Sequence, residues 1–170
     1  KNYSNKNVSI ILDLEDSAQD LFSKKKTRNL KNICREGLIY ISKNKTLIKN
    51  NIFIRINKID TQEFNSDIKA IKSSIRYGLK IKGIFVPKVE NFSELNKTNN
   101  ILNKNYRIKL VPIIETKKGL KNLENIVKKD KNKIISHVHY GHFDYCLDQN
   151  FWPFPEPYHK EYWDIITPIL

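Results

Sequence analysis

Charged residues follow or interrupt the short apolar runs of this sequence, and their types suit metal-assisted chemistry on an oxo acid. Glu115 and Asp144 follow two neighbouring runs, and Arg55 lies inside another. Mg²⁺ binds proteins through one or two carboxylates, with water and substrate in the remaining positions. An arginine fork clamps a substrate carboxylate or stabilises an enolate oxygen. These residues predict a site in which a metal chelates the keto and carboxylate oxygens of a 2-oxo acid.

All five runs deliver a charged group at their carboxyl end. The segments that carry these groups are Asp13-Leu14-Glu15-Asp16, Arg55-Ile56-Asn57, Pro87-Lys88-Val89-Glu90, Glu115-Thr116 and Gly141-His142-Phe143-Asp144. The carboxyl ends of parallel strands lie on one side of an α/β fold, where active sites are built. We therefore expect these groups to gather there. Two structural alternatives are that they are solvated loop residues, and that an Arg–Glu ion pair serves only packing.

The runs themselves read as strands buried on both faces, because they are continuously apolar and rich in β-branched residues. They cover residues 8–12, 52–56, 83–86, 110–114 and 134–140. Between them, apolar residues recur at helical spacing, most clearly at Phe64, Ile68, Ile71 and Ile75, with Gly78 as the expected helix end. Further stripes are expected at 120–127 and 92–102, and from Leu21, Phe22, Leu30, Ile33 and Cys34 behind a Ser17 cap; a last helix is expected to start at Tyr158.

This alternation predicts an α/β fold of about five β-α units in one domain over residues 1–170. A doubly wound sheet and a (β/α)₈ barrel both satisfy the pattern. No glycine-rich phosphate loop follows any run, which disfavours a dinucleotide-binding fold. A complete barrel takes about 250 residues. Since the chain lacks Met and begins at Lys1, we expect it to be part of a longer protein.

The five polar segments, in their order and spacing from Val8 to Asp144, resemble citrate lyase β-subunit-like proteins. This broad family includes 4-hydroxy-2-oxoheptanedioate aldolases, citryl-CoA lyases and malyl-CoA lyases. The resemblance implies a (β/α)₈ TIM barrel, of which this chain covers roughly strands 2–6, assembled as trimers or hexamers. It implies a Mg²⁺-dependent (or Mn²⁺-dependent) carbon–carbon lyase or aldolase. The substrate would be a 2-oxo acid or an acyl-CoA, a CoA thioester.

The resemblance also implies roles for single residues. Glu115 and Asp144 correspond to the metal ligands, and Arg55 to the residue that binds the oxygen of the enolate. Glu15 and Asp16 correspond to the acidic loop that supports water or proton transfer beside the metal. Lys88 and Glu90 match a strand-end pair expected to contact substrate. The proline- and aromatic-rich segment 147–158 departs from the family and is expected to form a lid or a subunit interface.

Three other readings of the sequence remain open. The first is a non-catalytic basic module, binding RNA or acting as a scaffold on a degenerate barrel. The second is a zinc site made of His137, His139, His142 and Asp144, against which core or interface histidines are the plainer interpretation. The third is a nucleophilic Cys146 near His142, against which an ordinary buried thiol is the plainer interpretation.

Composition limits the partners. The formal charge is +13, but the sequence has 26 Lys and only 5 Arg. Arg is the residue that binds phosphates and bases through two simultaneous hydrogen bonds. Scattered lysines indicate a solvated surface, so no nucleic-acid partner is expected. No segment approaches the ~20 apolar residues of a membrane span. Two cysteines are too few for a disulfide scaffold and favour a reducing, cytoplasmic location.

Overall fold

Five parallel strands form the centre of the protein, as a computed structural model of residues 8–44, 51–102, 106–151, 156 and 158–167 shows. They are β1 (Ser9–Asp13), β2 (Asn51–Arg55), β3 (Ile81–Val86), β4 (Lys109–Ile114) and β5 (His139–Tyr140). Their spatial order equals their sequence order. Successive parallel neighbours joined by helices are the arrangement of a (β/α)₈ barrel, so the predicted partial barrel is confirmed.

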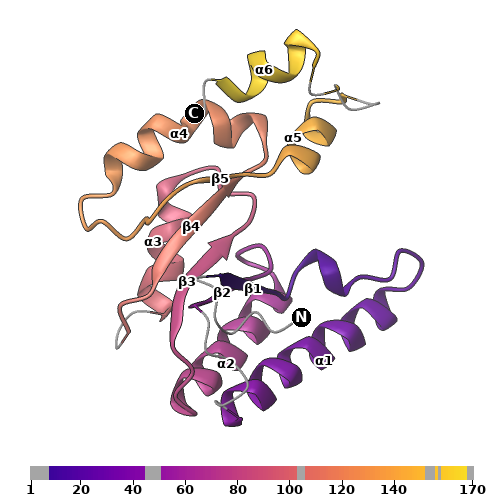
Figure 1. Cartoon of the computed structure of the whole chain (residues 1–170), viewed down its shortest axis with the longest axis vertical. Coiled ribbons are helices and arrows are strands. Elements are labelled where there is room, and N and C mark those ends of the chain that lie inside the picture. Colours follow the sequence, from indigo (N-terminus) through magenta and orange to yellow (C-terminus); the bar gives the residue numbers. More distant parts are fainter. Residues whose placement is uncertain (1–7, 45–50, 103–105, 152–155, 157, 168–170) are drawn as a thin grey trace.

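Helices connect the strands (Figure 1). They are α1 (Lys24–Lys43), α2 (Gln62–Arg76), α3 (Phe92–Leu102), α4 (Lys117–Lys129), α5 (His142–Asp148) and α6 (Lys160–Ile166), with a short 3₁₀ turn at Asp16–Ala18. Thr61 caps α2 and Thr116 caps α4, because their hydroxyl oxygens accept hydrogen bonds from the backbone amides of Phe64 and Gly119, respectively. Gly78, at φ 87°, follows the end of α2 as expected. In the described part of the chain no helix is long and apolar enough for a membrane span.

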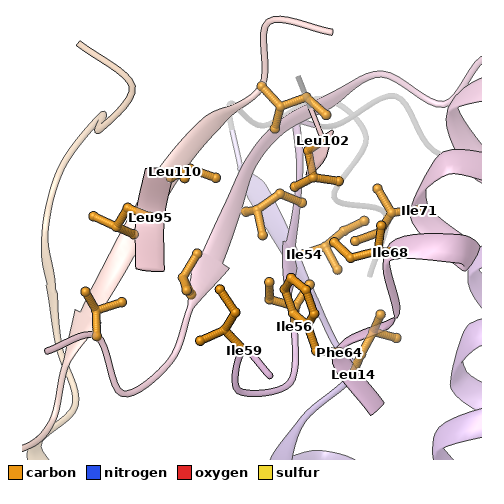
Figure 2. Close-up of a cluster of buried hydrophobic side chains, with 14 of the residues drawn as sticks. Leu14, Ile54, Ile56, Ile59, Phe64, Ile68, Ile71, Leu95, Leu102 and Leu110 are labelled. Carbon is orange, nitrogen blue, oxygen red and sulfur yellow. The ribbon is translucent and has the colours of Figure 1, made fainter. Parts of the chain in front are cut away.

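The main core lies between the sheet and its helices. Alternate strand residues point outward into it, together with the apolar stripes of the helices. Figure 2 shows part of this core, with Leu14, Ile54, Ile56, Ile59, Phe64, Ile68, Ile71, Leu95, Leu102 and Leu110 labelled. The expected stripe of α2 therefore contributes to the core as predicted, and so does that of α4 except for Val127, which is 50% exposed.

The opposite, inner face of the sheet carries a smaller apolar cluster. Phe85, Val111 and Ile113 are buried there, and Phe53 packs against them. Gly83 allows the Phe53 ring to cross the neighbouring strand, since a Cβ at this position would lie 2.8 Å from that ring. Because side chains alternate along a strand, Arg55 shares the inner face with Phe53. The inner face therefore leads directly to the carboxyl-end site.

Three expectations about elements are wrong. Ser17 lies in the short 3₁₀ turn, and α1 begins later, capped by the hydroxyl of Ser23. Of the expected apolar stripe only Cys34 packs against the core. The other members are exposed, two of them before the helix and two on it: Leu21 (87%), Phe22 (97%), Leu30 (39%) and Ile33 (62%). The strand expected over 134–140 is confined to His139–Tyr140, with one further bridge between Leu110 and Ile135.

The segment 147–158, expected to form a lid or an interface, is described only in part. Leu147 and Asp148 end α5, and residues 149–151 follow it. Residues 152–155 and 157 lie outside the described residues. The expectation therefore stays a prediction.

Candidate active site

A cavity of about 750 Å³ opens at the carboxyl ends of the strands. Four of the site residues proposed from the sequence line this cavity: Asp16, Arg55, Glu115 and Asp144. Its other lining residues are Gln19, Leu21, His139, Tyr140, Gly141, His142, Phe143 and Leu147. The predicted convergence of charged strand ends is therefore observed for β2 and β4 and for the loops after β1 and β5, although Glu15 in the first of these loops does not line the cavity.

Arg55 is held by the first strand. Asp13 lies directly opposite it in the parallel register of β1 and β2. The Nε of Arg55 donates to Asp13 Oδ1 at 2.8 Å, and its Nη2 donates to Asp13 Oδ2. Burial raises the pKa of Asp13, but the hydrogen bonds from Arg55 and from two backbone amides outweigh this and lower it to about 2. Asp13 therefore stays ionised and fixes one edge of the guanidinium.

The other edge of Arg55 faces the acidic loop. Its Nη1 lies 3.4 Å from Glu15 Oε2 and 3.6 Å from Asp16 Oδ2. These distances are too long for strong hydrogen bonds. Nη1 is therefore the part of the guanidinium that remains available to an oxygen in the cavity.

Glu15 is a buried carboxyl that is only 6% exposed. Its Oε2 accepts no hydrogen bond in the described part of the chain. Burial and the negative charge of Asp16 raise the pKa of Glu15 to about 8, although Arg55 opposes the shift. At neutral pH Glu15 is therefore mostly a protonated acid, whereas an ordinary glutamate is ionised.

A buried network holds the loop that carries Glu15. Asn57 donates through Nδ2 to the carbonyl of Leu14 at 2.7 Å and to Asp67 Oδ2 at 2.8 Å. Asp67 also accepts the backbone amide of Asn57 at 2.7 Å and the Nε of Arg35 at 2.8 Å. Lys31 from α1 donates to Asn57 Oδ1. Helices α1 and α2 thus fix the backbone just before Glu15, a role that the strand-end pattern did not reveal for Asp67.

Glu115 and Asp144 are the two carboxylates expected to hold a metal. Glu115 is 5% exposed, and its Oε1 accepts the backbone amide of Lys88 at 2.8 Å. Burial and the negative charge of Asp144 together raise the pKa of Glu115 to about 7, although the backbone hydrogen bond and charge of Lys88 oppose the shift. Asp144 Oδ2 lies 3.0 Å from the Nζ of Lys88. Both carboxylates line the same cavity, so β4 and α5 present them to a common space.

Gly141 lets Glu115 occupy its position. A Cβ at residue 141 would lie 2.7 Å from the Cβ of Glu115 and would also meet its Oε2. Any other residue would push the carboxylate out of place. The glycine before α5 is therefore a requirement of the site that became visible only in the structure.

The two carboxylates fit a hard divalent cation. Their donors are oxygens only, which suits Mg²⁺ or Mn²⁺ and not a soft metal. Burial is the main cause of the raised pKa of Glu115, and the negative charge of Asp144, which a cation would offset, adds to it. Among the described residues no three His, Cys, Asp or Glu side chains are grouped to hold a metal. A site with two protein carboxylates leaves the other positions to water and substrate, which is how Mg²⁺ is commonly bound.

Lys88 and Glu90, expected to contact substrate, occupy different surroundings. Neither is among the residues that line the cavity. Lys88, in a left-handed conformation at φ 53°, reaches the cavity edge through Asp144. Glu90 instead pairs with Lys118 at 2.7 Å and accepts Thr116 Oγ1 at 3.4 Å. The structure thus brings Lys88 to the site and ties Glu90 to the start of α4.

The zinc and thiol interpretations lack the geometry that they need. His137 stacks edge-on against Phe85 on the inner face of the sheet, and no set of three metal ligands forms around it within the described residues. Cys146 is fully buried, and burial raises the pKa of its thiol. A nucleophilic cysteine needs a lowered pKa. Cys146 is therefore a structural thiol, although His142 Nδ1 lies 3.6 Å from its sulfur.

The buried acid Glu15 predicts a pH dependence of stability. Glu15 holds its proton up to about pH 8 in the folded protein, whereas in the unfolded chain its pKa is the ordinary value of 4.5. The contribution of Glu15 to folding stability is therefore fully present below about pH 4.5 and is lost as the pH rises through 8. We expect Glu15→Gln to flatten this loss between pH 5 and 8, by on the order of 2 kcal/mol.

The measurement is the urea midpoint of unfolding across this pH range, without added divalent cations. Glu124→Gln is the matched control, since the Glu124 side chain is 79% exposed and lies away from the cavity. The control is expected to keep the slope of the natural protein. An unchanged slope in Glu15→Gln would show that Glu15 is ionised in the folded state.

Comparisons with known proteins agree with the fold. RipC from Yersinia pestis has a similar structure, with a TM-score of 0.66 and 22% identity over 94% of this chain and 60% of RipC. A citrate lyase from Burkholderia xenovorans LB400 matches with a TM-score of 0.58 and 15% identity, over 84% of this chain and 42% of that protein. This chain thus spans less than two thirds of either. No curated protein sequence matches it significantly. Residues 6–152 match the HpcH/HpaI aldolase/citrate lyase family, and the chain therefore belongs to that family.

Proposed function

We propose that this protein is a Mg²⁺-dependent carbon–carbon bond lyase or aldolase that acts next to a carbonyl through an enolate. The observation that carries the proposal is the cavity at the strand ends, where Glu115 and Asp144 face Arg55. The family membership supports this class of reaction. The substrate class is a 2-oxo acid, with a CoA thioester as the alternative that the family also suggests.

Each residue has a defined task in this proposal. Glu115 and Asp144 would hold Mg²⁺, which when bound supplies Lewis-acid stabilisation of negative oxygen. Arg55, oriented by Asp13, directs its Nη1 at the oxygen on which enolate charge develops. Donors that are already oriented stabilise such charge without reorganising, which makes this the largest expected contribution.

The acidic loop, Glu15 and Asp16, supplies the proton that converts the enolate to product. Glu15 carries a proton at neutral pH because its pKa is about 8. A group whose pKa lies near the working pH is an efficient general acid or base. Glu15 lies beside Arg55 Nη1, and its neighbour Asp16 lines the cavity, so the proton of Glu15 would reach the enolate carbon, and return from it, through water at Asp16.

The test is enolisation without bond cleavage. We expect the protein to exchange the methyl protons of pyruvate for deuterium in D₂O, as followed by proton NMR, when Mg²⁺ or Mn²⁺ is present. Chelation by EDTA should stop the exchange and added metal should restore it. Acetyl-CoA in place of pyruvate tests the thioester class. If metal-loaded protein exchanged neither compound, the proposed reaction class would be wrong.

A further inference from the structure

His139 is a cavity residue that the proposed roles do not use. It lies on β5 opposite Ile113 of β4, so its side chain shares the inner face of the sheet. It lines the same cavity as Arg55, Glu115 and Asp144. The sequence analysis favoured a core or interface role for this histidine, but the structure leaves it exposed toward the cavity.

The ring of His139 is oriented but its nitrogens are available. Phe85 meets it edge to face, with ring centroids 5.6 Å apart and planes at 83°. Within the part of the chain that the structure describes, neither ring nitrogen hydrogen-bonds to a protein group. His137, two residues earlier on the same face, differs: its Nδ1 lies 3.0 Å from Ser136 Oγ, and it does not line the cavity.

The surroundings keep His139 neutral. Burial lowers its pKa, and the charges of His137 and Arg55 lower it further. A neutral imidazole offers one N–H donor and one lone pair. An ionised carboxylate only accepts hydrogen bonds, and the guanidinium of Arg55 only donates them. His139 therefore adds a base next to the groups that stabilise an enolate.

We propose that His139 accepts the proton of the substrate hydroxyl when the carbon–carbon bond breaks. This inference rests on the proposed function. As the O–H proton moves to a ring nitrogen of His139, the hydroxyl carbon becomes a carbonyl. The electron pair of the breaking carbon–carbon bond passes into the enolate of the 2-oxo acid. The proton on His139 then leaves to water, and a second proton from the acidic loop converts the enolate to product.

Two reactions separate this role from the rest of the site. Cleavage of 4-hydroxy-2-oxopentanoate to pyruvate and acetaldehyde requires removal of a hydroxyl proton. Decarboxylation of oxaloacetate gives the same pyruvate enolate with loss of CO₂, and no hydroxyl proton moves. A residue that serves only the hydroxyl should matter in the first reaction and not in the second.

The variants are His139→Gln and, as the matched control, His137→Gln. We expect His139→Gln to lower kcat for cleavage about a hundredfold, the usual size of a general-base contribution, and to change decarboxylation less than about twofold. His137→Gln should leave both rates near those of the natural protein. Equal losses in both reactions, or no loss in cleavage, would overturn the role of His139. A natural protein that catalyses neither reaction with Mg²⁺ would overturn the proposed function itself.

Discussion

Replacing Arg55 by lysine is expected to lower the rate of enolate formation about a thousandfold, which is the upper range for losing one pre-oriented donor. Lysine keeps the positive charge, but it lacks the planar guanidinium that donates two hydrogen bonds to the carboxylate of Asp13. A lysine ammonium paired with Asp13 would have no second edge to present to substrate. The loss should therefore appear in kcat and much less in binding.

Lysine is a better probe than alanine at this position. Arg55 contacts three carboxylates, those of Asp13, Glu15 and Asp16. Alanine at position 55 would leave these carboxylates without their cation and would therefore lower stability as well as activity. Retaining the charge separates catalysis from folding.

The measurement pairs pyruvate exchange with urea unfolding for Arg55→Lys. Arg76→Lys is the control, because Arg76 is exposed at the end of α2 and the chemical change is identical. We expect the two variants to unfold within about 1–2 kcal/mol of the natural protein. Activity within threefold of the natural protein in Arg55→Lys would remove Arg55 from the reaction and leave it an ion-pair residue.

Replacing Glu115 by glutamine is expected to abolish metal-dependent turnover, with a loss of about a thousandfold or more. The amide keeps the shape of the side chain and can still accept the Lys88 backbone hydrogen bond. It removes the negative charge that a divalent cation requires. Because Glu115 is only 5% exposed and already has a raised pKa of about 7, the neutral side chain suits its burial. We therefore expect unchanged or slightly higher stability together with lost activity.

The candidate site could be predicted from sequence because parallel strands end on one side. Apolar runs located the strands, and the charges that follow them then had to meet at one edge. Arg55, Glu115 and Asp144, which this argument expected to lie together, all line one cavity, whereas Glu15, Lys88 and Glu90 do not. The argument needs only strand direction, which short apolar runs and helical connections supply.

The partners of these residues depend on register, which sequence does not show. Asp13 became the main partner of Arg55 because Asp13 and Arg55 pair across β1 and β2. Gly141 became essential because its backbone lies against Glu115. Likewise, His139 faces the cavity only because it pairs with Ile113. A shift of one residue in any strand would send these side chains to the other face.

The strand expected over 134–140 is interrupted between two regions that pair with β4. The carboxylate of Asp130 accepts the backbone amides of Ile134 and Ile135, both at 2.8 Å. Pairing with β4 nevertheless begins here, because the carbonyl of Ile134 accepts the amide of Leu110 at 2.9 Å and the amide of Ser136 donates to the carbonyl of Leu110 at 3.0 Å. The regular ladder resumes only at β5. Apolar character alone did not reveal this interruption.

A thermal-shift titration with Mg²⁺ and oxalate, a mimic of pyruvate enolate, tests the central claim most directly. A compound that binds only the folded state raises the unfolding midpoint by mass action. For the natural protein we predict a rise of several degrees that needs both Mg²⁺ and oxalate. The rise should vanish in Glu115→Gln and persist in the exposed control Glu124→Gln. The account would be contradicted if no rise occurred with both present, or if an equal rise occurred in Glu115→Gln.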